Sequence, residues 1–135
     1  MGIDFGGKRI GIAFSDPSAT LASAYEVYNS RGEKKDIEYL AELAEEMSAK
    51  VIVIGLPFNA DGTECEMTLR VRQFGCGLAE KTGKQVEFED ERFTSLEADE
   101  MLKESGRSWQ ERKKILDMVS AEIILQNYLN KIKRG

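Results

Sequence analysis

The chain opens with the stretch Gly2-Ile3-Asp4-Phe5-Gly6-Gly7-Lys8-Arg9-Ile10-Gly11-Ile12-Ala13-Phe14. Large apolar residues alternate with small or polar ones on both sides of the Gly6-Gly7 pair. Alternation with a period of two predicts β-strands, and two glycines between such runs predict a tight turn. The segment Ser15-Asp16-Pro17-Ser18 predicts a second turn, because proline fixes φ and serine or aspartate bonds back to the backbone. With a third strand expected over residues 20–28, the chain begins as three antiparallel strands.

The hydrophobic period changes after this opening. Apolar residues at helical spacing predict an amphipathic helix; they are Ile37, Leu40, Leu43, Ala44 and Met47. The β-branched run Val51-Ile52-Val53-Ile54 predicts a strand that is buried on both faces. A capping box at Thr63-Glu64-Cys65-Glu66 predicts the start of a second helix, which Gly83 would end. Val86 and Phe88 alternate with glutamates, which predicts a fifth strand.

The last third of the chain is expected to be mainly helical. Thr94-Ser95-Leu96-Glu97 matches a second capping box and predicts a short helix through about Glu104. The polar and basic segment Ser105–Lys114 is expected to be a loop. A final helix is expected from Asp117, with one stripe formed by Met118, Ala121, Leu125, Tyr128, Leu129 and Ile132.

This order of elements predicts a three-layer α/β protein. Its mixed five-stranded sheet would have three antiparallel strands followed by two parallel strands, flanked by helices, because each helical crossover returns the chain in the same direction. The order is shared by the RNase H-like fold, in which the first strand is central. Composition alone would not select that fold among α/β arrangements.

Composition restricts the chemistry and the compartment. The 135 residues carry 19 basic and 24 acidic side chains, a net charge of −5, and no histidine. The lack of histidine excludes Ser-His-Asp and Cys-His catalysis and any zinc site that needs histidine. The two cysteines, Cys65 and Cys76, are expected to be free thiols. The longest apolar run is far below the ~18 residues of a membrane span, and the first residues do not resemble a signal peptide, so we expect a cytoplasmic protein.

Three acids stand where the ends of strands or helices are expected. Asp4 precedes the Gly6-Gly7 turn, Glu91 follows the fifth strand, and Asp117 begins the last helix. Ligand sites of open α/β sheets gather beyond the carboxyl ends of parallel strands, and clustered carboxylates suit hard divalent cations. Two such ions can activate a water and stabilise the leaving oxygen of a phosphodiester. Chance placement is the alternative, since the chain has 24 acids and a helix N-terminus alone favours Asp117.

Four segments resemble signatures of the YqgF family, RNase H-like proteins described as pre-16S ribosomal RNA nucleases or Holliday junction resolvases. The resemblance rests, in chain order, on Gly2–Ala13 with Ser15-Asp16, on Gly55-Leu56-Pro57 with Asp61-Gly62-Thr63, on Asp90-Glu91-Arg92-Phe93-Thr94-Ser95 with Glu97-Ala98, and on Asp117 with Ser120-Ala121 and the residues that follow. It spans the chain nearly end to end. It implies a single RNase H-like domain over residues 1–135.

The resemblance also implies a site and a cofactor. Asp4, Glu91 and Asp117 would be the catalytic acids and would hold Mg²⁺ or Mn²⁺, with a metal-bound water attacking the phosphorus. Glu89 and Asp90 are adjacent to Glu91, and strand alternation sends neighbours to opposite faces, so a shift of one residue in the end of the strand would exchange the candidate acid.

Basic residues are unevenly distributed, with 6 in residues 1–67 and 13 in residues 68–135. Several flank the predicted acids and could guide phosphates there. The nucleic-acid-binding candidates are Lys8, Arg9, Arg70, Arg92, Trp109, Arg112, Lys113 and Lys114. Trp109 has two interpretations: it stacks on an unpaired base, or it packs onto the core while the charges around it form a solvated loop.

The favoured hypothesis is a metal-dependent endonuclease that processes the 5′ end of pre-16S ribosomal RNA. The first alternative is a Holliday junction resolvase on branched DNA, for which symmetric cutting requires a dimer. The second is a non-catalytic module that binds RNA or ribosomal particles. A further hypothesis is a nucleotide-hydrolysing relative of actin-like ATPases and sugar kinases. It is disfavoured, because those proteins need two such domains. The expected oligomeric state is a monomer or weak homodimer.

Overall fold

The computed structural model describes residues 1–90 and 103–134, without the side chains of Lys114, Asp117, Lys133 and Arg134. The capping box expected at Thr94–Glu97 and nearly all of the short helix that would follow it lie outside the described residues. The elements are β1 Gly2–Phe5, β2 Arg9–Ser15, β3 Ala22–Asn29, α1 Glu33–Glu46, β4 Val51–Leu56, α2 Glu66–Thr82, β5 Gln85–Asp90 and α4 Trp109–Arg134.

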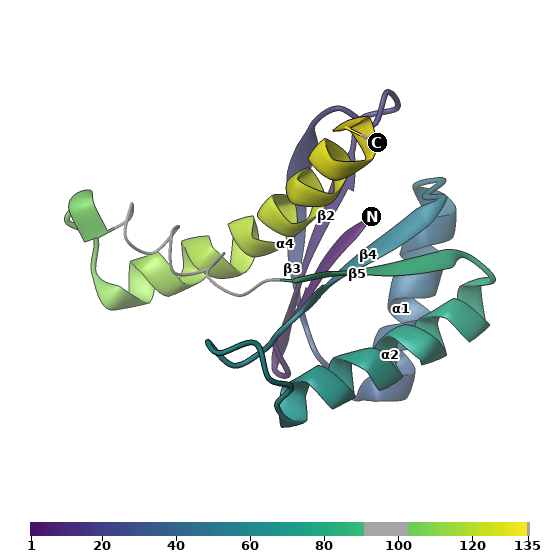
Figure 1. The fold of residues 1–135 in the computed structure, drawn as a ribbon, viewed down its shortest axis with the longest axis horizontal. Coiled ribbons are helices and arrows are strands. Elements are labelled where there is room, and N and C mark those ends of the chain that lie inside the picture. The colour runs from purple at the N-terminus through teal and green to yellow at the C-terminus, as the bar shows by residue number, and fades with distance from the viewer. Residues whose placement is uncertain (91–102, 135) are drawn as a thin grey trace.

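The five strands form one mixed sheet in the order β3-β2-β1-β4-β5 (Figure 1). The β1–β2 and β2–β3 pairs are antiparallel, and the β1–β4 and β4–β5 pairs are parallel. The predicted α/β architecture with a central first strand is thus confirmed. Because β1, β4 and β5 are parallel, their carboxyl ends lie at the same edge of the sheet.

Helices cover both faces of the sheet (Figure 1). One core lies between the sheet and the helices α1 and α2, and it contains Ile3, Phe5, Ile10 and Phe74. The other core lies between the sheet and α4. Since side chains alternate along a strand, the inward-facing Ile3 and Phe5 place Asp4 on the opposite face, which α4 covers.

Gly2 lets α4 lie directly on the central strand. A Cβ placed at Gly2 would come within 2.7 Å of the Leu125 Cβ and 2.9 Å of the Ala121 carbonyl oxygen. Both atoms belong to the rigid body of the helix, not to the end of a flexible side chain. The distance between β1 and α4 therefore depends on the absence of a side chain at this position.

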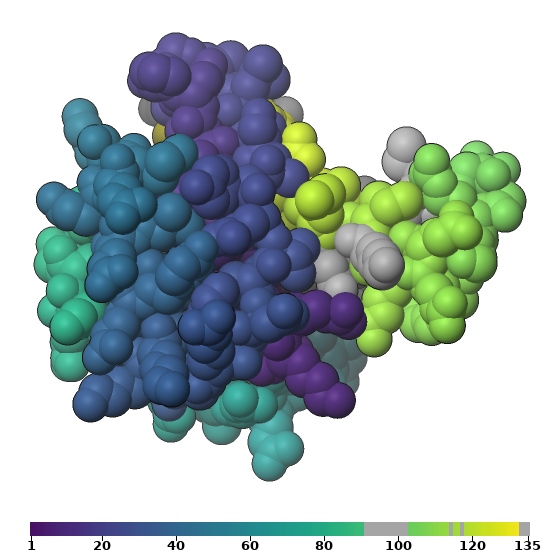
Figure 2. Space-filling view, turned by 180° about the vertical axis from the view of Figure 1, so that it is seen from behind, coloured from purple at the N-terminus to yellow at the C-terminus, as the bar shows by residue number. Residues whose placement is uncertain are grey.

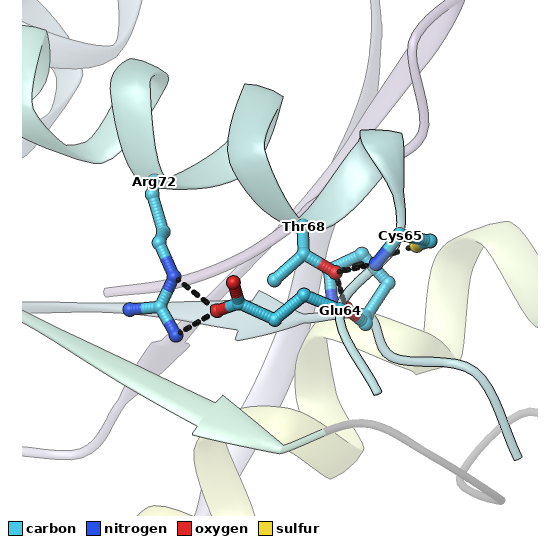
Figure 3. A network of polar contacts seen from close by, with 5 residues as sticks. Glu64, Cys65, Thr68 and Arg72 are labelled. Atoms are coloured by element: carbon cyan, nitrogen blue, oxygen red, sulfur yellow. Dashed lines mark hydrogen bonds and ion pairs between the residues drawn. The ribbon is translucent and has the colours of Figure 1, made fainter. Parts of the chain in front are cut away.

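The predicted start of the second helix is wrong by two residues, because the expected N-cap was Thr63. The helix begins at Glu66, with Cys65 as its N-cap. The Cys65 backbone N–H donates to the Thr68 hydroxyl at 3.0 Å, and this buried hydroxyl donates to the Pro57 carbonyl (Figure 3). The Thr63 hydroxyl instead donates to the Asp61 carboxylate at 2.7 Å within the preceding loop. The bond from Thr68 to the segment after β4 therefore sets the start of α2.

The expected loop over residues 105–114 is also wrong in its second half. Helix α4 begins at Trp109, because Ser108 caps it: its carbonyl accepts from the Arg112 N–H at 2.9 Å and its hydroxyl from the Glu111 N–H at 3.3 Å. Glutamine, glutamate, arginine and lysine are good helix formers, so a polar segment is no obstacle to a helix. The spacing Ser108-x-x-Glu111 matches a capping box and is the feature of the sequence that marks this helix start.

Helix α4 is much longer than the strands it covers. Its 26 residues span about 39 Å, whereas even the eight residues of β3 span about 27 Å. Its N-terminal turns project from the body of the molecule in both views (Figures 1 and 2). Met118 and Ile132, at the two ends of the expected stripe, are 49% and 50% exposed. None of the helices in the described part of the chain is both long and apolar enough to cross a membrane.

We expect Gly2→Ala to lower the free energy of unfolding by about 1–3 kcal/mol, because its Cβ would overlap rigid atoms of α4. Urea unfolding followed by circular dichroism measures this change. Gly77→Ala in α2 is the control, since its Cβ would meet only the terminal Cδ1 of Ile37 and alanine favours the helix by about 1 kcal/mol. Equal stability of the two variants would contradict the proposed role of Gly2.

Candidate functional site

A cavity of about 570 Å³ lies at the carboxyl end of β1. Its walls come from the β1–β2 hairpin, the first turns of α2 and the N-terminal part of α4. The residues that line it are Asp4, Gly6, Gly7, Lys8, Arg9, Gly11, Met67, Arg70 and Lys113. Three segments that are distant in the sequence thus meet around the Asp4 carboxylate.

Asp4 is half-buried on the central strand. Its partner across the antiparallel ladder is Gly11 on β2. Residues directly opposite each other share one face of a sheet, so a larger residue at Gly11 would extend over the position beside Asp4. Gly11 itself lines the cavity beside Asp4.

The hairpin turn places two cations at the cavity. The Gly6 N–H donates to the Arg9 carbonyl at 2.9 Å, which closes the turn. Gly7 has a φ of 86°, a conformation that favours glycine. A Cβ at Gly6 would come within 2.8 Å of the Arg9 carbonyl oxygen, so this turn needs glycine there as well. The tight turn holds Lys8 and Arg9 beside Asp4 at the cavity wall.

Arg70 and Lys113 supply two further cations from helices. The Arg70 guanidinium lies over the Phe5 ring, 5.6 Å from its centroid. Phe5 in turn packs against Phe74, with the ring centroids 4.6 Å apart. This contact fixes Arg70 next to the strand that carries Asp4. Four cations therefore line a cavity with one described carboxylate, which makes it attractive to an anion such as a phosphodiester.

The backbone of Asp117 lies in α4, between a helical turn that reaches the cavity and a helical turn that contacts β1. Four residues earlier, Lys113 lines the cavity with Asp4. Four residues later, the Ala121 carbonyl lies against Gly2 on β1. Positions four apart follow one row along a helix. The segment of α4 that contains Asp117 therefore runs along the same face of the sheet as Asp4.

The acids at the end of β5 occupy different environments. Glu89 is buried, and its carboxylate pairs with Lys131 of α4 at 2.6 Å. Asp90 is exposed at the last position of the strand. Glu91 lies outside the described residues. Among the acids and cysteines whose side chains the structure describes, no group of three could hold a metal ion, but this set excludes both Glu91 and Asp117.

The structure separates the eight nucleic-acid-binding candidates into three groups. Lys8, Arg9, Arg70 and Lys113 line the cavity. Trp109 and Arg112 lie in the first turn of α4, before Lys113, and Trp109 is 60% exposed, so the interpretation that it packs onto the core is wrong. Arg92 and the side chain of Lys114 lie outside the described part of the chain.

Four cavity-lining residues were not among the site candidates from the sequence: Gly6 and Gly7, which were expected only to form a turn, and Gly11 and Met67. Gly11 could have been found from the hairpin register, because it stands opposite Asp4. Met67 carries no such signal: it has the helical spacing of a core residue, and only the position of α2 places it near Gly7, whose Cβ would lie 3.7 Å from the Met67 Cε.

The sheet order and the helices on both faces define the class of protein as RNase H-like. Two solved structures of RuvC from Thermus thermophilus share this fold. One has a TM-score of 0.58 at 14% identity and covers 98% of this chain and 95% of that chain. The other, RuvC in complex with a Holliday junction substrate, has a TM-score of 0.59 at 15% identity and covers 98% and 93%.

The chain belongs to the RuvX family, whose model, described as Holliday junction resolvase, matches residues 1–131. A protein from Syntrophomonas wolfei is 42% identical over 130 residues, covering 96% of this chain and 92% of that protein. One from Clostridioides difficile is 43% identical over 131 residues, with the same coverage of 96% and 92%. Both are named "Putative pre-16S rRNA nuclease". The resemblance to the YqgF family, the same family as RuvX, is confirmed.

Proposed function

We propose that this protein is a metal-dependent endonuclease that hydrolyses phosphodiester bonds, and that its substrate is the 5′ end of pre-16S ribosomal RNA. The observation that carries the proposal is the cavity in which Asp4 lies among Lys8, Arg9, Arg70 and Lys113. A carboxylate for metal ions and cations for phosphates are the two requirements of such a site. The names of the relatives support the ribosomal RNA substrate.

We assign Asp4, Glu91 and Asp117 as the acids that hold Mg²⁺ or Mn²⁺. Carboxylate oxygens are the ligands that these ions prefer, and the chain has no histidine to offer. Asp4 opens onto the cavity, and the Asp117 backbone lies on the helix that covers the same face of β1. The donor chemistry and the placement of Asp4 therefore fit a hard divalent ion.

The basic residues bind and orient the substrate. Lys8 and Arg9 are held by the glycine turn next to Asp4, so the phosphate they attract enters beside the carboxylate. Arg70 and Lys113 approach from the helices and hold the adjoining backbone. When bound, a pair of divalent ions would acidify a water and offset the charge that develops on the leaving oxygen, which removes the need for a histidine base.

Holliday junction cleavage is the second candidate function. The description of the RuvX family favours it, and a junction presents the same phosphodiester chemistry to the same cavity. Symmetric cutting of a junction requires two sites, so this candidate also requires a homodimer. If neither substrate is cleaved, the protein is instead a module that binds RNA or ribosomal particles without cutting them.

Asp4→Asn should strongly reduce the rate of cleavage. The protein is incubated with a pre-16S ribosomal RNA fragment and with a synthetic four-way junction, each with Mg²⁺, with Mn²⁺ and with a chelator. Loss of a metal ligand removes several kcal/mol of transition-state stabilisation, so we expect roughly a thousandfold lower rate. Glu42→Gln, on an exposed part of α1 away from the cavity, should keep full activity. Undiminished cleavage by Asp4→Asn would refute the assignment.

Glu91→Gln and Asp90→Asn distinguish the two neighbouring acids in the same assay. The assignment expects a large loss of rate for Glu91→Gln and a small effect for Asp90→Asn. The reverse result would move the metal ligand to Asp90. Thermal unfolding of both variants checks that a lost activity does not reflect a lost fold.

Arg70→Ala and Lys113→Ala should each weaken nucleic-acid binding in the absence of divalent ions. Each removed phosphate contact should reduce the slope of log affinity against log salt concentration by about one. Fluorescence anisotropy of a labelled RNA oligonucleotide over a salt series measures this slope. Lys34→Ala, on an exposed part of α1, is the charge-matched control. An unchanged slope in both cavity variants would place the substrate elsewhere.

A further inference from the structure

Trp109 is a large aromatic side chain exposed at a fixed position. It is the first residue of α4, and 60% of its surface is accessible to solvent. Ser108 caps the helix at this point through its carbonyl and hydroxyl oxygens. The indole is therefore carried by a regular helix, which holds a binding group more firmly than a loop does.

Arg112 orients the indole and adds charge next to it. Its guanidinium lies over the Trp109 ring, 5.5 Å from the centroid, and its Nη1 donates to the Arg107 carbonyl at 3.0 Å. The guanidinium thus contacts the indole and the chain before the helix at once. An aromatic ring beside a fixed cation is the arrangement with which proteins hold an unpaired nucleobase and its phosphate.

The indole lies a short way along the helix from the proposed active site. Lys113, which lines the cavity with Asp4, is four residues after Trp109. That spacing is about 6 Å along the helix axis, and it places the two residues on one row. A strand that has a phosphate at Lys113 can therefore bring a neighbouring base to Trp109.

We propose that Trp109 and Arg112 form a stacking platform for an unpaired base next to the phosphate held in the cavity. This inference rests on the proposed nuclease function and narrows its substrate class to nucleic acids with unpaired nucleotides beside the scissile bond. In a continuous duplex every base is already stacked and paired, and turning one out costs a few kcal/mol. The platform therefore favours single-stranded or flared substrates over intact duplexes.

Intrinsic fluorescence tests the platform directly, because Trp109 is the only tryptophan in the chain. The protein is titrated in a chelator with a single-stranded RNA, a single-stranded DNA of the same sequence and a blunt duplex. Stacking on a base should quench the emission of Trp109 with both single strands and much less with the duplex. The comparison of RNA with DNA shows whether the sugar matters to the platform.

Affinities of two variants separate stacking from charge. Trp109→Ala should weaken single-strand binding between about fivefold and 150-fold and leave duplex binding and the salt slope unchanged. Trp109→Phe should restore most of the affinity, because phenylalanine keeps an aromatic face. Lys113→Ala should instead lower the salt slope, as expected for a phosphate contact.

Each result has a distinct meaning. Single-strand binding without quenching, or with full affinity in Trp109→Ala, overturns the platform and leaves the proposed nuclease function intact. Equal weakening of single-strand and duplex binding in Trp109→Ala also overturns it, because the contact would then not require an unpaired base. Failure of every nucleic acid to bind the wild-type protein overturns the proposed function itself and the platform with it.

Discussion

The close contact between β1 and α4 at Gly2 is the constraint on which the proposed site depends. With no Cβ at Gly2, the Ala121 carbonyl and the Leu125 Cβ lie directly against the central strand. Asp4 is two residues farther along that strand, and Asp117 is one turn earlier on that helix. A side chain at Gly2 would push the two elements apart and change the distance between the acids they carry. The absence of a side chain at Gly2 thus sets the spacing of the two elements that carry Asp4 and Asp117, which come from opposite ends of the chain.

Under the proposed function, the charges around Asp4 would have two opposed roles. A carboxylate that binds metal ions repels a phosphodiester, so the substrate must be attracted by other groups. Lys8 and Arg9 from the hairpin, together with Arg70 and Lys113 from the two helices, line the cavity wall and would provide that attraction. The charge of Glu89, which is buried near the end of β5, is compensated by an ion pair with Lys131 of α4. This compensation matters because an unpaired buried carboxylate is strongly destabilising.

The strands and the first helix could be predicted because their hydrophobic periods are strong, whereas the central place of β1 was expected from the order of elements that the chain shares with the RNase H-like fold. The starts of α2 and α4 could not be placed, since several residues near each can act as a cap. At α2 the buried Thr68 hydroxyl decides, because it bonds the Pro57 carbonyl after β4. At α4 the Ser108 cap adds eight residues to the helix before Asp117. Of the candidate site, Asp4 with Lys8 and Arg9 is local to one hairpin, and strand alternation is enough to group them.

The sequence by itself determined the available chemistry: carboxylates for hard ions, no histidine, and cations near the first acid. Only the tertiary structure decided that Arg70 and Lys113 join Asp4, because their positions follow from how α2 and α4 pack on the sheet. It also decided that Trp109 is exposed. A helix longer than the strands beneath it must leave its ends uncovered, and the length of α4 was set by a cap that periodicity does not show.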